Sequence, residues 1–114
     1  MPKAFEVKVE RVDGRAVVRI AGEFDLAATR AVDEALLEIE GESPEVVVLD
    51  LREVTFLDST GLRTITSADA RARETGHELR IVRGPEQIQK LLFVTGMDKI
   101  LPLVDDPGQS ADSR

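Results

Sequence analysis

Four consecutive residues near the middle of the chain combine carboxylate and hydroxyl groups with a glycine: Asp58, Ser59, Thr60 and Gly61. They open a segment with helical spacing, and both Asp and Ser are favoured at a helix N-terminus, where they accept hydrogen bonds from unpaired amides. One capping residue would suffice, however, and a glycine in the first helical turn costs about 1 kcal/mol relative to alanine. The alternative to a simple cap is a site at which something must approach the backbone closely at Gly61.

The residues around Ser59 do not support a hydrolytic serine. The nucleophile elbow of the α/β-hydrolases needs Gly-x-Ser-x-Gly, and Leu57 stands where the first glycine is required. The sole histidine, His77, lies in a Gly-His-Glu turn and is typical of a solvated surface residue rather than a triad base. We therefore predict a protein that is not an enzyme.

Two further aspartates lie at or just after predicted strands. Asp50 resembles the phosphorylated aspartate of a receiver domain, but such a site needs two more acidic residues after the first strand to hold Mg²⁺. The first strand here leads into a hairpin, which favours a strand-end residue bonded to backbone. Asp25 is predicted to cap a helix. Alternatively, Asp25 belongs to a second acidic loop beside the Ser59 loop, because both loops follow strands and precede helices.

The composition argues against several classes of partner. A chain of 114 residues predicts one domain, and the lack of cysteine excludes a disulfide framework and a thiolate metal site. The net charge of -7 argues against nucleic acid and against an anionic membrane surface. No apolar run approaches the roughly 18 residues of a membrane span. We expect a cytoplasmic protein with neither metal nor cofactor.

Hydrophobic periodicity predicts an α/β fold that positions these residues. Asp13-Gly14 between two β-rich runs is a strong hairpin signal. The expected order is strand, strand, helix, strand, helix, strand, helix and a short closing element, which makes one mixed β-sheet opened by an antiparallel hairpin with helices packed against it. The predicted strands are Phe5 to Glu10, Ala16 to Ala21, Glu45 to Leu51 and Leu79 to Val82, and the predicted helices are Leu26 to Glu40, about Thr60 to Glu74, and Pro85 to Thr95.

Three motifs occur in register along this pattern. The segment Ile20 to Asp25 contains Gly-Glu-Phe-Asp, Val54 to Leu62 contains Asp-Ser-Thr-Gly-Leu, and a closing segment runs from Leu91 to Ile100. Together they resemble the STAS-domain anti-sigma factor antagonists of bacteria over nearly the whole chain. We expect a STAS domain over residues 1–104 and a disordered polar tail over residues 105–114.

The resemblance implies a role for the residues of the middle motif. Ser59, directly after the motif aspartate, would be phosphorylated by a partner anti-sigma factor that is itself a serine kinase, and a serine phosphatase would reset it. The unphosphorylated form would bind the anti-sigma factor and release a sigma factor. Many members have glycine where this chain has Arg63, which is expected to alter the choice of partner. The residues expected to contact the partner are Asp25, Asp58, Thr60, Gly61 and Arg63.

Two alternatives to this phosphoswitch are compatible with the residues. A constitutive scaffold module of the same fold would bind its partner without any phosphorylation. A receiver-type domain would instead carry its phosphate on Asp50.

Overall fold

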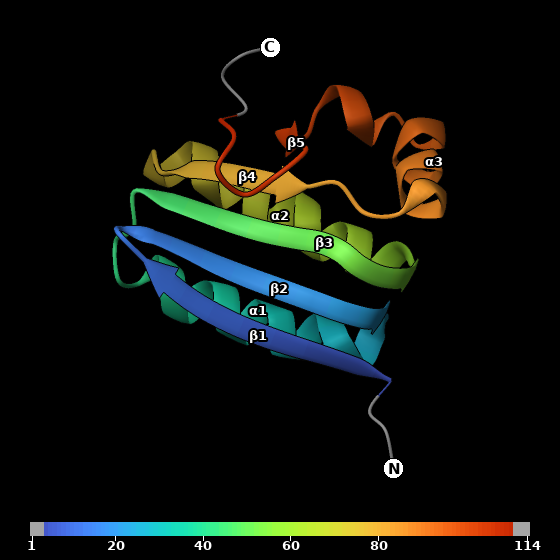
Figure 1. Ribbon diagram of the computed structural model, residues 1–114, viewed down its shortest axis with the longest axis horizontal. Coiled ribbons are helices and arrows are strands. Elements are labelled where there is room, and N and C mark those ends of the chain that lie inside the picture. The colour runs from blue at the N-terminus through green and yellow to red at the C-terminus, as the bar shows by residue number, and fades with distance from the viewer. Residues whose placement is uncertain (1–3, 111–114) are drawn as a thin grey trace.

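The computed structural model describes residues 4–110 and confirms the α/β class with one mixed sheet (Figure 1). The five strands are ordered in the sheet as in the chain. The first pair is antiparallel and every later pair is parallel. The elements are β1 (Phe5–Val12), β2 (Arg15–Phe24), α1 (Leu26–Glu40), β3 (Val46–Leu57), α2 (Ser59–Thr75), β4 (Glu78–Val82), α3 (Glu86–Val94), the 3-10 helix η1 (Met97–Lys99) and β5 (Leu103–Val104).

The opening hairpin is the one that the Asp-Gly pair predicts. Asp13 and Gly14 both have positive φ, 48° and 76°, as a two-residue type I′ turn requires. Val12 pairs with Arg15 across the turn. The turn therefore sets the register of β1 on β2.

Strands β2 and β3 both run farther than their apolar residues predict. β2 continues through Gly22 to Phe24, and β3 continues through Arg52 to Leu57. Gly22, with φ 90°, bends β2 without ending it, and the register between the two strands shifts on either side of this point. Because the strands lengthen together, both deliver their following loops to the same edge of the sheet.

Helices α1 and α2 cover one face of the sheet (Figure 1). The predicted apolar stripe of α1, which includes Val32, Leu36 and Ile39, is buried. On α2 the small residues Ala68 and Ala72 are buried, which allows the helix to approach the strands closely. Core packing therefore fixes the orientation of α2, whose first residue is Ser59.

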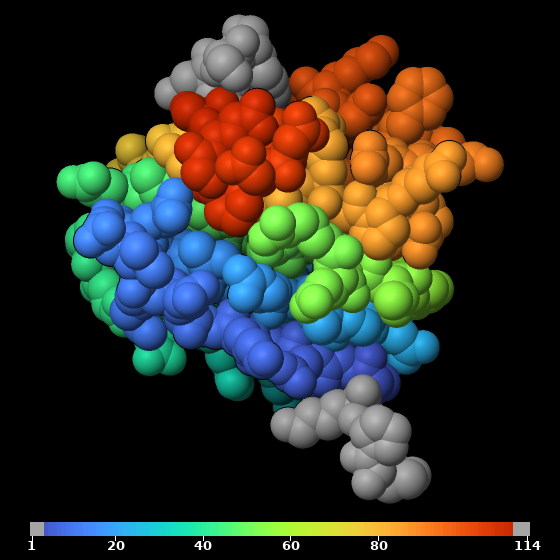
Figure 2. Space-filling view, viewed as in Figure 1, coloured from blue at the N-terminus to red at the C-terminus, as the bar shows by residue number. Residues whose placement is uncertain are grey.

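The opposite face of the sheet carries a smaller apolar cluster and the C-terminal segment. This cluster consists of Val17, Val48, Val82 and Val104. Figure 2 shows the red segment of residues 105–110 lying over the upper part of this face. The Pro107 carbonyl accepts hydrogen bonds from Arg80 at 3.0 Å and Arg15 at 3.4 Å. Residues 105–110, expected to belong to a disordered tail, thus bond to the sheet, while residues 111–114 lie outside the described residues.

Candidate functional site

The two loops that carry the acidic motifs meet at one edge of the sheet. The last residues of β2 and β3, Phe24 and Leu57, are register partners, and the Asp58 amide donates to the Phe24 carbonyl at 3.5 Å. Asp25 and Asp58 therefore follow directly from neighbouring strand ends. The structure places the second acidic loop beside the Ser59 loop, as the strand-to-helix pattern predicts.

Asp25 and Asp58 play the same local role, each as the N-cap of its helix. Both have extended backbones, with φ of -110° and -104°. One carboxylate oxygen of Asp25 accepts from the amides of Ala27 at 3.1 Å and Ala28 at 3.2 Å. The corresponding oxygen of Asp58 accepts from the second and third residues of α2 at 3.0 Å each. Both carboxylates are thus held against the start of their own helix.

Asp58 also holds the hydroxyl of Thr60. The Thr60 hydroxyl donates to the same Asp58 oxygen at 2.6 Å. This bond, with the Gly61 and Thr60 amides, keeps the pKa of the Asp58 carboxyl below its usual range. The carboxylate is charged at neutral pH. The hydroxyl that Asp58 orients is therefore that of Thr60 and not that of the neighbouring Ser59.

Ser59 is the first residue of α2 rather than its cap, and its side chain is exposed. Within residues 4–110 no group forms a hydrogen bond with the Ser59 hydroxyl. Of the two residues that suit a helix N-terminus here, Asp58 is therefore the cap and Ser59 is not. Because Asp58 supplies the cap, the Ser59 hydroxyl is left available to another molecule.

Gly61 is buried where the two loops meet. A β-carbon built on it would stand 2.6 Å from the Phe24 carbonyl oxygen and 2.6 Å from the Leu57 Cδ1 atom. The close approach that the glycine suggested is real, and it is made by this chain's own β2 and β3. Gly61 allows the first turn of α2 to rest on the two strand ends.

Arg63 lies exposed in α2, four residues beyond Ser59. It borders a shallow hollow of about 410 Å³ between α1 and α2, whose rim also includes Thr60 and Leu26. Leu26 is 70% exposed at the start of α1. This exposed apolar side chain beside the Ser59 loop was not predicted, since a single exposed leucine carries no signal in the sequence.

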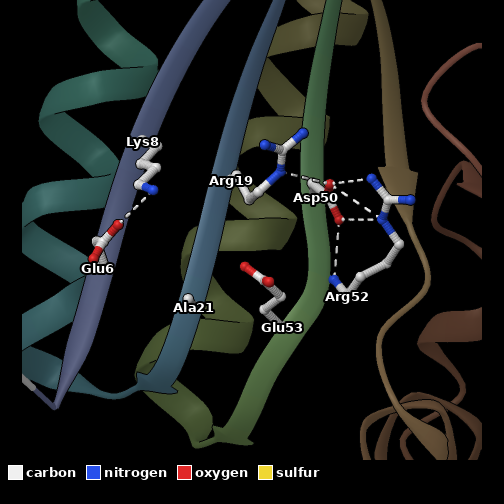
Figure 3. Close-up of a pocket in the computed structure, with 7 residues that line it drawn as sticks. All are labelled: Glu6, Lys8, Arg19, Ala21, Asp50, Arg52 and Glu53. Atoms are coloured by element: carbon white, nitrogen blue, oxygen red, sulfur yellow. Dashed lines mark hydrogen bonds and ion pairs between the residues drawn. The ribbon is translucent and has the colours of Figure 1, made fainter.

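Asp50, the alternative phosphate acceptor, lies on the open face of the sheet and is ion-paired (Figure 3). The Arg52 guanidinium donates to both carboxylate oxygens at 2.8–3.2 Å, and Arg19 donates at 3.2 Å. Burial by itself raises the pKa of Asp50, but the hydrogen bonds from Arg52 and Arg19 outweigh it and the pKa is lowered. In the described part of the chain no three acidic or histidine side chains are placed to hold a metal ion. A receiver-type site is not assembled there.

His77 is remote from Ser59. The two residues lie at opposite ends of α2, whose 17 residues separate them by about 25 Å. The His77 Nδ1 atom instead hydrogen-bonds the Thr75 hydroxyl at 2.6 Å. This histidine cannot act as a base for Ser59.

No helix within residues 4–110 has the length and hydropathy needed to cross a bilayer.

Comparisons with known proteins agree with this geometry. The model of the STAS domain family matches residues 6–109. An anti-sigma-F factor antagonist, RsfB of Mycobacterium tuberculosis, is 30% identical over 102 residues, which cover 90% of this chain and 83% of that protein.

Solved structures show the same fold. The crystal structure of an anti-sigma factor antagonist from Mycobacterium paratuberculosis superposes with a TM-score of 0.78 at 29% identity, covering 95% of this chain and 92% of that one. The Bacillus cell fate determinant SpoIIAA in its phosphorylated form has a TM-score of 0.71 at 14% identity, over 89% of this chain and 91% of that one. The last comparison shows the fold alone. With the family model spanning both loops of the site, the chain belongs to the STAS domain family.

Proposed function

We propose that this STAS domain is an anti-sigma factor antagonist whose affinity for an anti-sigma factor is switched by phosphorylation of Ser59. The names of the relatives support the first part. The observation that carries the second is the exposed Ser59 hydroxyl, which is unbonded because Asp58 caps α2. The protein acts as a kinase substrate in the cytoplasm and is not itself an enzyme.

The proposed modification is a phosphoryl transfer from ATP, catalysed by an anti-sigma factor that is a serine kinase. The Ser59 oxygen forms a bond to the γ-phosphorus, the bond from that phosphorus to the β,γ-bridging oxygen breaks, and ADP leaves. The hydroxyl proton passes to a base of the kinase. A serine phosphatase reverses the change by hydrolysing the phosphate ester.

The domain keeps its fold in both states. A phosphate on Ser59 adds about -1.5 to -2 charges at neutral pH, and a helix N-terminus tolerates an anion. The amides of Thr60 and Gly61 already bond to Asp58, so the phosphate displaces no cap. Its effect falls on the bound partner instead.

The partner meets a surface whose charge changes. Asp25 and Asp58 already make this edge of the sheet acidic, so a phosphate on Ser59 increases the negative charge of a surface that is already negative. A partner oxygen that accepts the proton of the free hydroxyl loses that hydrogen bond on phosphorylation and meets a bulky dianion instead. Steric and like-charge penalties of a few kcal/mol lower the affinity roughly 10²- to 10³-fold.

The partner-binding residues divide into two kinds on this proposal. Asp25, Asp58, Thr60 and Arg63 supply surface to the anti-sigma factor. Gly61 is buried and contributes by holding the two loops together.

Labelling with a purified anti-sigma factor kinase and radioactive ATP tests the acceptor. Wild-type protein should gain an acid-stable label and Ser59→Ala should gain none, while Ser59→Ala still binds the unlabelled kinase. Label that is lost in acid and persists in Ser59→Ala would place the phosphate on an aspartate such as Asp50 and refute the assignment.

A binding comparison separates the switch from a constitutive scaffold. Ser59→Asp should weaken binding, whereas Ser43→Asp, which adds the same charge in the exposed loop between α1 and β3, should leave binding unchanged. Equal affinities for wild type and Ser59→Asp would instead favour the scaffold.

A further inference from the structure

Arg63 is one of two arginines within residues 4–110 whose guanidinium groups have no bonded partner. Arg30 is the other, and the remaining arginines of this range form ion pairs or hydrogen bonds. Arg63 is also exposed and lies on the same helix as the proposed phosphate acceptor. The Arg63 guanidinium is therefore available to bind a negative charge introduced at Ser59.

The spacing of Ser59 and Arg63 is that of a helical ion pair. Residues four apart lie on one face with β-carbons about 5–6 Å apart, and an anion N-terminal to the cation is the favourable order. Side chains in a helix lean toward its N-terminus, so the long Arg63 side chain can reach a phosphate on Ser59. The planar guanidinium can donate two parallel hydrogen bonds to phosphate oxygens.

We propose that Arg63 is the intramolecular partner of the phosphate on Ser59. The proposal rests on the function proposed above and deepens it, because it assigns a second part to the switch. In the unphosphorylated protein Arg63 is free to contact the anti-sigma factor. In the phosphorylated protein its charge is engaged by the phosphate and withdrawn from that contact.

Other charged groups near this position do not remove the free cation. Asp58 is bonded to the first turn of α2 and to Thr60. Asp33 borders the same hollow as Arg63 but forms no ion pair with it. Asp25 caps α1. These three carboxylates are common to all variants used below, so their effect on the phosphate cancels in the comparison.

A phosphorus NMR titration tests the pair in the full-length protein. Phosphoserine is incorporated at residue 59 during translation, so no kinase is needed. The midpoint for loss of the second phosphate proton should lie about 0.3 pH units lower in the wild type than in Arg63→Gln, as expected for an exposed i,i+4 ion pair. Arg63→Lys keeps the positive charge, so its midpoint should lie close to that of the wild type and below that of Arg63→Gln.

Arg30→Gln is the matched control. Arg30 stands five residues beyond the cap of α1, as Arg63 stands five residues beyond the cap of α2, so both variants lose one exposed positive charge at the same helical position. An unchanged midpoint in Arg30→Gln supports the proposal. No difference between wild type and Arg63→Gln, or an equal shift in both variants, overturns it.

The two proposals fail in different ways. If an anti-sigma factor kinase leaves Ser59 unlabelled, the proposed function fails while the titration still reports on the pair. If labelling succeeds and Arg63→Gln has the wild-type midpoint, the pair is refuted and the proposed function stands.

Discussion

Substitution of Gly61 by alanine tests how the two loops of the site are joined. The added β-carbon would stand 2.6 Å from the Phe24 carbonyl oxygen and 2.6 Å from Leu57 Cδ1, whereas carbon atoms in favourable contact are about 3.5–4.0 Å apart. The Leu57 side chain can rotate away. The Phe24 carbonyl cannot move freely, because it accepts the Asp58 amide and belongs to the pairing of β2 with β3.

Two opposing terms set the size of the effect. Alanine in a helix is favoured over glycine by about 1 kcal/mol. Overpacking a tight site costs typically 1–3 kcal/mol, and the upper end applies to Gly61 because one of the two crowded atoms is backbone. The net result is a loss of about 2 kcal/mol in the free energy of unfolding.

Urea denaturation followed by circular dichroism is the suitable assay, since the chain has neither Trp nor Tyr for a fluorescence signal. Gly61→Ala should lower the urea midpoint with an unchanged slope. Ala70→Gly, at an exposed position of the same helix, is the control for helix propensity and should lose about 1 kcal/mol. A Gly61→Ala protein as stable as the wild type, or more stable, would refute the close packing of α2 on the strand ends.

Three further predictions concern the Asp58 cap, the ion pairs of Asp50 and the exposed Leu26. Asp58→Ala removes the α2 cap and the bond to Thr60, so the free energy of unfolding should fall by about 1–2 kcal/mol in a urea titration, and Asp58→Asn, which keeps an accepting oxygen, should lose less. Because the pKa of folded Asp50 is lowered, its stabilising contribution is complete above the unfolded pKa of about 3.9 and is lost as the pH falls through the folded value. Urea midpoints of the wild type should therefore fall more steeply with acid than those of Asp50→Asn, which should itself cost about 2 kcal/mol at neutral pH through weakened hydrogen bonds to the two arginines. Leu26→Ser should leave stability within about 0.5 kcal/mol and weaken binding to the anti-sigma factor in calorimetry, and an unchanged affinity would exclude the start of α1 from the interface.

Periodicity predicts the sheet, the hairpin and the helices because each rests on local patterns. The full length of β3, in contrast, depends on pairing with a distant segment of the chain. Arg52, Glu53 and Thr55 interrupt its apolar run, and the segment remains a strand because β2 extends beside it past Gly22. The same tertiary pairing brings Asp25 next to the Ser59 loop.

The identity of the α2 cap is the least predictable feature of the site. Asp58 and Ser59 are adjacent and both suit an N-cap, so composition alone does not choose between them. The choice is made by where β3 ends, at Leu57. The same holds for Gly61. A glycine in the first helical turn indicates that another group approaches closely, but only the fold identifies Phe24 and Leu57 as the residues that do so.

The one-residue difference in the cap decides whether Ser59 can act as a switch. If Ser59 were the cap, its oxygen would accept from the amides of the first turn, and phosphorylation would disrupt a bond worth about 0.5–2 kcal/mol. With Asp58 as the cap, those amides are already bonded to a carboxylate. The hydroxyl of Ser59 then makes no hydrogen bond that the fold needs, so a phosphate there should leave the stability of the domain unchanged. In the proposed switch the two states would differ at the surface that the partner contacts, which would confine the effect of the phosphate to binding.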